Sequence, residues 1–167
     1  ESNGCGKLNS FDNHILETIR KQGVTHIWFT GVIAHASRTD YSNNGIPTSH
    51  PATVKGNAGS PYAIRDYFNI DPDLAENVRC RMKEFTNLIE RVHNNGMKFG
   101  IWIEPEMVNV KSELYEKHPD WVLRHPDFEP SYGRGGGQML LDLTNPKVQD
   151  YVFSIVDDLL TENPDVY

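Results

Sequence analysis

The stretch GMKFGIWIEPEMV, residues 96–108, decides the fold of this chain. Its side chains alternate between two faces, as they do in a strand. One face is apolar and suits packing under helices: Phe99, Ile101 and Ile103. The other face begins with a glycine and ends in a carboxylate: Gly100, Trp102 and Glu104. Because Pro105 has no N–H to give to a sheet ladder, it ends the strand, and the whole pattern is typical of a strand that lines a pocket.

Helices and strands alternate on either side of this stretch. Apolar periodicity predicts three longer helices, over residues 13–22, 78–95 and 146–160. Asp12 or Asn13 suits the cap of the first helix. β-branched and aromatic residues predict strands over 24–30, 121–124 and 139–143. The remaining long segment, 31–77, is polar and rich in glycine and proline, and a loop of this length is usually functional or carries small elements of its own.

The alternation determines the expected fold class. Parallel strands joined by crossover helices produce this order of elements. A (β/α)₈ barrel needs at least about 200 residues, and this chain has 167. We therefore expect an α/β fold, a partial TIM barrel of about three to four βα units with parallel strands, in one domain over residues 1–167.

The composition restricts the classes of partner. Hydrophobic residues make up 38% and charged residues 23% of the chain, as in soluble globular proteins. The net charge of -7, without a basic run, argues against nucleic acid, and no apolar stretch approaches the roughly 20 residues of a membrane helix. Cys5, Cys80 and the histidines lack metal-ligand spacing, so we expect no metal and no cofactor. The compartment stays open between a bacterial-type cytoplasm and periplasm.

Three motifs stand in the N-terminal part: GVTHIWFTGVI (23–33), TDYSNNGIP (39–47) and SPYAIRDYFNIDPDLA (60–75). On these motifs, residues 4–96 resemble the alpha-amylase family of glycoside hydrolases. The resemblance implies that the first helix and strand are the first helix and the second strand of a barrel. It also implies that Tyr41 and His35 lie in a loop that touches sugar, although each is equally well interpreted as a solvated loop residue.

Four motifs stand in the C-terminal part: GMKFGIWIEPEMV (96–108), SELYEKHPDWVL (112–123), GRGGGQ (133–138) and LLDLTNPKVQDYVF (140–153). On these motifs, residues 97–167 resemble the melibiase-type alpha-galactosidases. The two resemblances meet near residues 93–98, where both families end a helix and begin a strand. We therefore interpret the chain as an apparent chimera, whether natural or engineered.

The galactosidase resemblance implies two contacts with the substrate. Trp102 would form an apolar wall around a terminal galactose, because aromatic rings suit the C–H face of a pyranose. The strand pattern alone predicts a core tryptophan equally well. Arg134, in GRGGGQ, matches the arginine of the family's glycine–arginine turn, and its guanidinium has donors suited to sugar hydroxyls. Without the resemblance, Arg134 is interpreted as a surface arginine.

Three carboxylates lie near these residues in the sequence. A retaining glycosidase needs two carboxyl groups about 5–5.5 Å apart on opposite sides of the anomeric carbon, whereas Glu104 and Glu106 would approach from one wall. We therefore interpret both as supporting residues that pair with lysine or arginine on the next strands. Asp142 is expected to hold Arg134 or to cap the turn before Asn145.

The two resemblances together imply retaining hydrolysis of an alpha-glycosidic bond, with an alpha-galactoside or an alpha-glucan as the carbohydrate partner. Neither family's nucleophile nor its general acid has a counterpart in the sequence, so we assign no catalytic residue and expect the chain alone to be inactive. The alternative is a structural half-barrel, engineered or fused, that acts without catalysis. Open strand edges and apolar faces would favour a homodimer of such a half-barrel.

Overall fold

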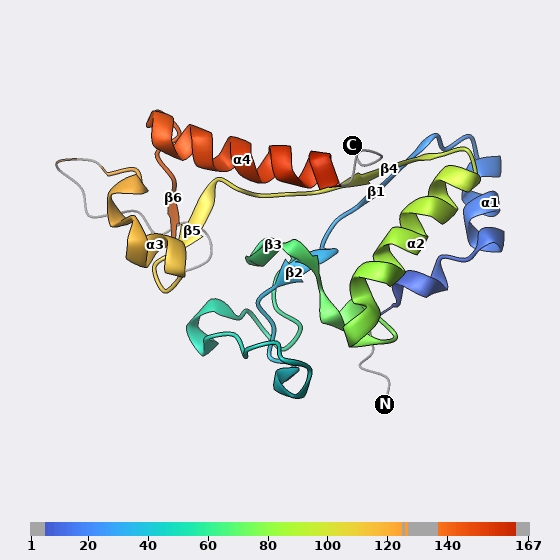
Figure 1. The fold of residues 1–167 in the computed structure, drawn as a ribbon, viewed down its shortest axis with the longest axis horizontal. Helices are drawn as coiled ribbons and strands as arrows, with labels where there is room; N and C mark the ends of the chain where they lie inside the picture. The colour runs from blue at the N-terminus through green and yellow to red at the C-terminus, as the bar shows by residue number, and fades with distance from the viewer. Residues whose placement is uncertain (1–5, 125, 127–136, 163–167) are drawn as a thin grey trace.

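The computed structural model of the chain describes residues 6–124, 126 and 137–162 (Figure 1). The helices within these residues are α1 (Asn13–Lys21), α2 (Arg81–Asn94), α3 (Glu113–Lys117) and α4 (Pro146–Glu162). The strands are β1 (His26–Phe29), β2 (Ile33–His35), β3 (Ile64–Ile70), β4 (Lys98–Ile101), β5 (Met107–Asn109) and β6 (Gln138–Leu140). Short 3₁₀ turns connect several of them. The three long helices predicted from periodicity are confirmed, with shifts of a few residues at their ends.

The strands β1 and β4 form a parallel pair, with Trp28 opposite Gly100 and Phe29 opposite Ile101. α2 lies between them in the sequence, so it forms part of the crossover that parallel pairing requires. α1 begins at the expected cap, since the Asp12 carboxylate accepts a hydrogen bond from the Ile15 N–H at 2.9 Å. This part of the chain therefore has the α/β arrangement that the sequence predicts.

One hydrophobic core joins the parallel pair to its helices. It includes Leu16 of α1, Leu88 and Val92 of α2, and Phe99 of β4, all of which are essentially inaccessible to solvent. The Phe99 ring lies edge-on to Phe85 of α2, with ring centroids 5.5 Å apart. The helices therefore cover one face of β1 and β4.

Among the described residues the other strand pairs are antiparallel, so within this part of the chain the expectation of three to four parallel units is met only by the pair β1–β4. β2 pairs with β3, and their register is interrupted at Ala34. Both strands belong to the polar segment 31–77, which folds back on itself instead of remaining a loop. β5 pairs with β6. The strand predicted over 121–124 is reduced to an isolated bridge between Val122 and Leu141.

The decisive stretch 96–108 forms two strands instead of one. β4 ends at Ile101, and a turn at Pro105 and Glu106 precedes β5. The ladder to β1 extends by one bond, because the Trp102 N–H donates to the Phe29 carbonyl at 3.1 Å. The sheet thus stops before Pro105, earlier than the sequence predicts, and the chain re-enters extended structure in β5 to pair with β6.

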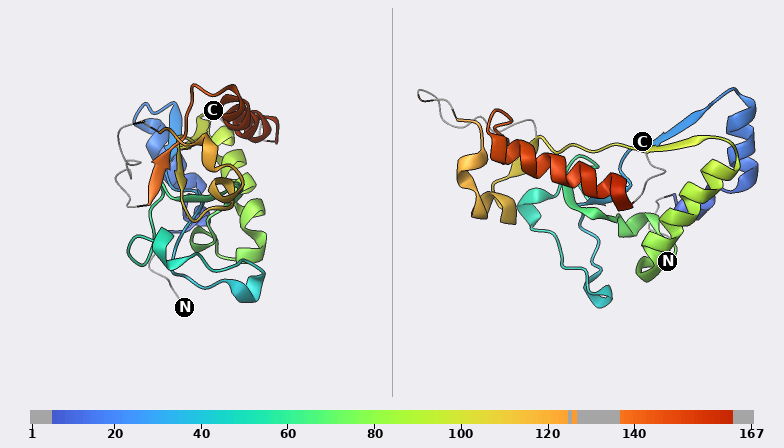
Figure 2. Two further views of the ribbon diagram at one scale, coloured as in Figure 1. Left: turned by 90° about the vertical axis from the view of Figure 1, so that its left-hand side faces the viewer. Right: turned by 45° about the horizontal axis from the view of Figure 1, so that its top comes forward.

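A second core lies around β5 and β6. Its buried residues are Val108, Trp121, Val122, Met139, Leu141 and Val148. Figure 1 shows α1 and α2 toward one end of the molecule and α3, β5 and β6 toward the other, with α4 running between the two ends. α4 packs against β3 on its way, and Figure 2 shows its course from two further sides. Within the described residues, no helix combines the length and apolar character needed to cross a membrane.

Candidate functional site

Trp102 lies directly after β4, on the side of that strand that faces away from the helices. Its side chain keeps 43% of its surface exposed, whereas Phe99 on the opposite side is fully buried. Trp28 of β1 faces the same side as Trp102, because its neighbours Ile27 and Phe29 pack into the helix-covered core. The uncovered face of the parallel pair thus carries two indoles.

The two indoles form a tilted corner. The ring centroids of Trp28 and Trp102 lie 6.1 Å apart, and the ring planes are inclined by 47°. Trp28 is the more exposed of the two, at 66%. Our sequence analysis missed Trp28, although the alternation in VTHIWFT (24–30) carries the signal once helices are known to cover one face of the strand. Exposed aromatic faces of this kind suit the apolar side of a pyranose ring.

Glu104 determines the orientation of the Trp102 indole. Its Oε1 accepts a hydrogen bond from the Trp102 Nε1–H at 3.1 Å. The ion pairs with lysine or arginine that the sequence suggested for Glu104 and Glu106 are absent from the described part of the chain. The indole, two residues before Glu104 in an extended segment, supplies the donor instead.

The acidic turn is held from two directions. The Tyr67 hydroxyl of β3 donates to the Glu104 carbonyl at 2.9 Å, and the Leu141 N–H donates to the Glu106 carbonyl at 2.9 Å. Burial raises the pKa of Tyr67, and the charges of Tyr151, Glu106 and Glu104 act in the same direction. The phenol therefore stays protonated and remains a donor at neutral pH.

Asp142 organises the turn before α4. Its Oδ1 accepts hydrogen bonds from the Thr144 N–H at 3.0 Å and from the Thr144 hydroxyl at 2.6 Å. The Asn145 side chain, one residue further on, accepts from the Lys147 N–H at 3.0 Å and so caps the helix. The second role considered for Asp142 was a contact with Arg134, which lies outside the described residues.

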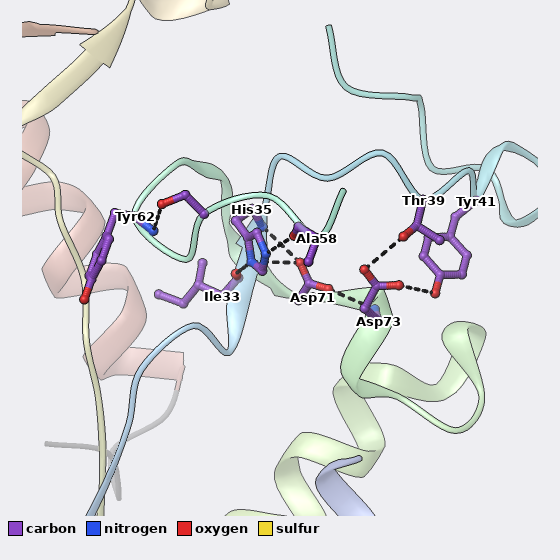
Figure 3. A network of polar contacts seen from close by, with 9 residues as sticks. Ile33, His35, Thr39, Tyr41, Ala58, Tyr62, Asp71 and Asp73 are labelled. Carbon is purple, nitrogen blue, oxygen red and sulfur yellow. Dashed lines mark hydrogen bonds and ion pairs between the residues drawn. The ribbon is translucent and has the colours of Figure 1, made fainter. Parts of the chain in front are cut away.

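His35 is held in a buried ion pair at the end of β2 (Figure 3). Its Nδ1 lies 2.9 Å from Oδ2 of Asp71, whose side chain is 1% exposed, and its Nε2 lies 3.0 Å from the Ala58 carbonyl. Burial lowers the pKa of His35, but the Asp71 hydrogen bond and charge, with the Ala58 and Ile33 carbonyls, raise it further than burial lowers it. The net effect favours the imidazolium, because both ring nitrogens then donate to acceptors.

Tyr41 is bound to a second carboxylate of the same network. Its hydroxyl donates to Oδ1 of Asp73 at 2.7 Å, and the Thr39 hydroxyl donates to Oδ2 at 3.1 Å. Asp71 and Asp73 are linked in turn, because Oδ1 of Asp71 accepts from the Asp73 N–H at 2.9 Å. His35 and Tyr41 are thus fixed parts of one polar network, and neither is a freely solvated loop residue.

This network borders a small pocket between the segment 31–77 and the start of α2. The lining includes His35 and Tyr41 together with three polar residues that the sequence analysis did not single out, Asp66, Asn69 and Arg81. The structure therefore arranges the predicted site residues in two groups: Trp102 with Glu104, and His35 with Tyr41. In the described residues no cluster of three or more histidine, cysteine or acidic side chains has a geometry suited to a metal ion.

Comparison with known proteins identifies the relatives of this chain. A model of the Melibiase family matches residues 73–167, more than half of the 167 residues. The bifunctional alpha-galactosidase/sucrose kinase AgaSK of Mediterraneibacter gnavus is 54% identical over 66 residues, which cover 40% of this chain and 7% of that protein. Alpha-galactosidase AgaA of Geobacillus stearothermophilus is 42% identical over 80 residues, which cover 48% of this chain and 11% of that protein.

Solved structures resemble nearly the whole of this chain. The noncanonic maltogenic alpha-amylase AmyB from Thermotoga neapolitana matches with a TM-score of 0.67 and 23% identity, over 99% of this chain and 35% of AmyB. A variant of the GH36 alpha-galactosidase AgaA from Geobacillus stearothermophilus, in complex with stachyose, matches with a TM-score of 0.57 and 22% identity, over 99% of this chain and 19% of AgaA. At this level of identity the likeness concerns the fold alone, and it shows that the chain corresponds to part of a barrel domain.

The family match confirms the resemblance to the alpha-galactosidases, and the alpha-amylase structures share the fold of the chain. The family match begins at residue 73, so it includes α2 as well as the stretch 96–108. The segments matched in the curated alpha-galactosidases make up about a tenth of the length of those proteins. With more than half of its length matched by the family model, this chain belongs to the melibiase family.

Proposed function

We propose that this chain forms part of the sugar-binding wall of a retaining glycoside hydrolase of the alpha-galactosidase type. The supporting observation is the Trp102 indole, which is exposed on the uncovered face of the parallel pair and oriented by Glu104. A terminal galactose would lie with its C–H face against this ring. Trp28, inclined to Trp102 by 47°, would contact the edge of the same sugar.

The fixed orientation of the indole favours binding. A ring that is already held in its bound position loses little conformational freedom when a ligand arrives. The hydrogen bond from Nε1 to Glu104 restricts rotation of the Trp102 side chain, and the Tyr67 hydroxyl fixes the backbone at Glu104. The wall is therefore preorganised from β3 as well as from β4.

Glu104 and Glu106 serve this wall as supporting residues in the proposal. Retaining hydrolysis needs one carboxylate as nucleophile and a second carboxyl group as acid and base, on opposite sides of the anomeric carbon. Glu104 already accepts a hydrogen bond from the indole, and Glu106 leaves the same turn two residues later. We therefore place the reacting carboxyl groups outside Glu104 and Glu106, and we expect the isolated chain to bind sugar without hydrolysing it.

Calorimetry with two sugars tests the proposal. Galactose-terminated stachyose, the ligand present in the AgaA structure, should release heat in a saturable titration, and maltose should bind more weakly. Substitution Trp102→Ala should weaken the response to stachyose. A stronger response to maltose would indicate that the site binds alpha-glucans, the substrates expected for the amylase-like part, and not alpha-galactosides. The absence of heat with either sugar would contradict sugar binding altogether.

A self-associating half-barrel is the second candidate function. Its supporting observation is the exposed apolar surface on two elements, Trp28 on β1 at 66% and Phe153 on α4 at 69%. Each of these aromatic side chains would bury apolar area against a second copy. Sedimentation velocity should then show a dimer that dissociates on substitution Phe153→Ser. A monomer at all accessible concentrations would exclude this function.

A further inference from the structure

We propose that a bulge in β3, formed by residues 67–69, positions the sugar wall by directing the Tyr67 hydroxyl at the turn after β4. This contact holds Trp102 in its binding orientation. Asp66 and Tyr67 are then positioning residues, which act through Glu104 without touching the sugar. The inference rests on the proposed function for the ligand, but it concerns β3, a strand that is not part of the sugar wall itself.

The bulge appears in the pairing of β2 with β3. Ile33 pairs with Ile70, and the next residue of β2, Ala34, pairs with Asp66. One step along β2 therefore corresponds to four steps along β3, and residues 67–69 have no counterpart in the ladder between the two strands. Bulges bend a strand and redirect its side chains, and they are common next to functional sites.

Asp66 stabilises the bulge from within. Its Oδ1 accepts a hydrogen bond from the Phe68 N–H at 3.0 Å, and its Oδ2 accepts from Nδ2 of Asn69 at 3.1 Å. One carboxylate thus binds two of the three bulged residues, and it supplies acceptors in place of the missing ladder partners. The bulge is therefore a built conformation of β3 and not a loose segment.

Tyr67, the first residue of the bulge, connects β3 to the acidic turn. Its hydroxyl donates to the Glu104 carbonyl at 2.9 Å, and the two positions are 37 residues apart. Its ring packs against the hydrophobic core of the parallel pair. A phenylalanine would fill the same space, so the hydroxyl contributes a directional contact in addition to the packing of the ring.

Glu104 passes this constraint to the indole. Its carbonyl is held by Tyr67, and its carboxylate accepts from Nε1–H of Trp102 at 3.1 Å. The backbone at Trp102 is held separately, because its N–H donates to the Phe29 carbonyl. Loss of the Tyr67 hydroxyl should therefore leave the Trp102 backbone in place but release the Glu104 side chain from the indole.

Hydrogen exchange of the indoles tests the positioning without any sugar. The chain has three tryptophans, and substitutions Trp102→Phe and Trp28→Phe assign their Nε1–H signals in a ¹⁵N–¹H correlation spectrum of the uniformly labelled full chain. In Tyr67→Phe the Trp102 signal should exchange with water up to about fivefold faster than in wild type, the effect of one hydrogen bond. The signal of Trp121, buried in the second core, should not change. An unchanged exchange rate at Trp102 would overturn the inference.

Calorimetry with stachyose measures the consequence for binding. Tyr67→Phe should weaken binding by up to about fivefold, because the wall then occupies its binding orientation for a smaller fraction of the time. Glu104→Ala removes the link through which Tyr67 acts, so the double variant should bind no more weakly than Glu104→Ala alone. Losses that multiply in the double variant would show that Tyr67 acts independently of Glu104, and would overturn the inference.

Two further variants separate positioning from general destabilisation. Asp66→Ala removes both acceptors of the bulge and should reproduce the effects of Tyr67→Phe on exchange and affinity. Tyr115→Phe removes a phenol hydroxyl next to the second core, where it accepts from Nη2 of Arg124 at 3.4 Å, and should leave both unchanged. Equal losses in Tyr115→Phe and Tyr67→Phe would overturn the inference. If Asp66→Ala does not fold, Tyr67→Phe decides.

The outcomes distinguish this inference from the proposed function. Stachyose binding that depends on Trp102 but not on Tyr67 would overturn the inference and leave the proposed function intact. Absence of stachyose binding to wild type would contradict the proposed function, and the exchange rate at Trp102 would still decide whether Tyr67 orients the indole.

Discussion

The buried pair of His35 and Asp71 should make the stability of this protein depend on pH. Nδ1 of His35 lies 2.9 Å from Asp71 Oδ2, and Nε2 lies 3.0 Å from the Ala58 carbonyl, so both ring nitrogens face acceptors. A neutral imidazole has only one N–H and would turn a lone pair toward one of these acceptors. The folded protein therefore favours the charged ring, and the pKa of His35 is raised in the folded state.

The direction of the effect follows from that shift. A group whose pKa is higher in the folded than in the unfolded state stabilises the fold fully below its unfolded pKa, about 6.5 for histidine. This contribution decreases as the pH rises through the folded pKa, by at most about 1.4 kcal/mol per pH unit for one group. Wild-type protein should thus lose free energy of unfolding between pH 6 and pH 9, and His35→Gln should lose less over the same range.

The cost of breaking the pair can be estimated from its burial. Asp71 is 1% exposed and also accepts from the Asp73 N–H. Removing one partner of a buried pair costs about 3–5 kcal/mol, and we expect Asp71→Asn near the lower end of that range because asparagine keeps one acceptor. Urea unfolding followed by tryptophan fluorescence at several pH values measures both effects. Parallel stability curves for wild type and His35→Gln would refute the assignment of a charged His35 paired with the buried Asp71.

Further substitutions test other parts of the account. Gly59 has φ of +79°, and an added Cβ would lie 1.8 Å from the Ala36 carbonyl oxygen. Gly59→Ala should therefore lower the free energy of unfolding, measured by urea titration, by at least about 2 kcal/mol. Gly56→Ala is the control, because Gly56 also has a positive φ but no close neighbour, so this substitution should cost only the strain of the backbone conformation. Glu104→Gln keeps an acceptor for the Trp102 indole, so the variant should retain its affinity for sugar in calorimetry. Glu104→Ala removes the acceptor and should weaken sugar binding about three- to tenfold. Equal losses of affinity in the two variants would show that the charge of Glu104, and not its hydrogen bond, is required.

Local signals in the sequence predicted the helices and the parallel pair. The Asp12 cap, the glycine that follows each of the first two helices, and the apolar face of 78–95 act within a few residues, so they can be recognised without tertiary information. The same holds for the alternation that places Phe99 in the core and Trp102 on the uncovered face. The exposed indole was therefore predictable as a candidate, but its hydrogen bond to Glu104 was not.

The features that the sequence analysis missed depend on contacts between distant residues. β2 and β3 pair across about 30 residues, and neither has a regular alternation that would reveal a strand. Asp71 was not singled out as a candidate, because its contact with His35 joins positions 36 residues apart. The pocket formed by Asn69 and Arg81 likewise appears only when the segment 31–77 meets the start of α2.

The most direct test of the central claim is a calorimetric titration of stachyose into wild type and Trp102→Ala. With 43% of the indole exposed and roughly half of that area covered by a sugar ring, about 50 Å² of apolar surface would be buried, worth about 1.3 kcal/mol or roughly tenfold in Kd. Trp121→Phe, a change at a buried indole of the second core, serves as the control for general packing effects. The account predicts about tenfold weaker binding for Trp102→Ala and unchanged binding for Trp121→Phe. Equal affinity of wild type and Trp102→Ala would contradict the claim that this indole forms the wall of a sugar site.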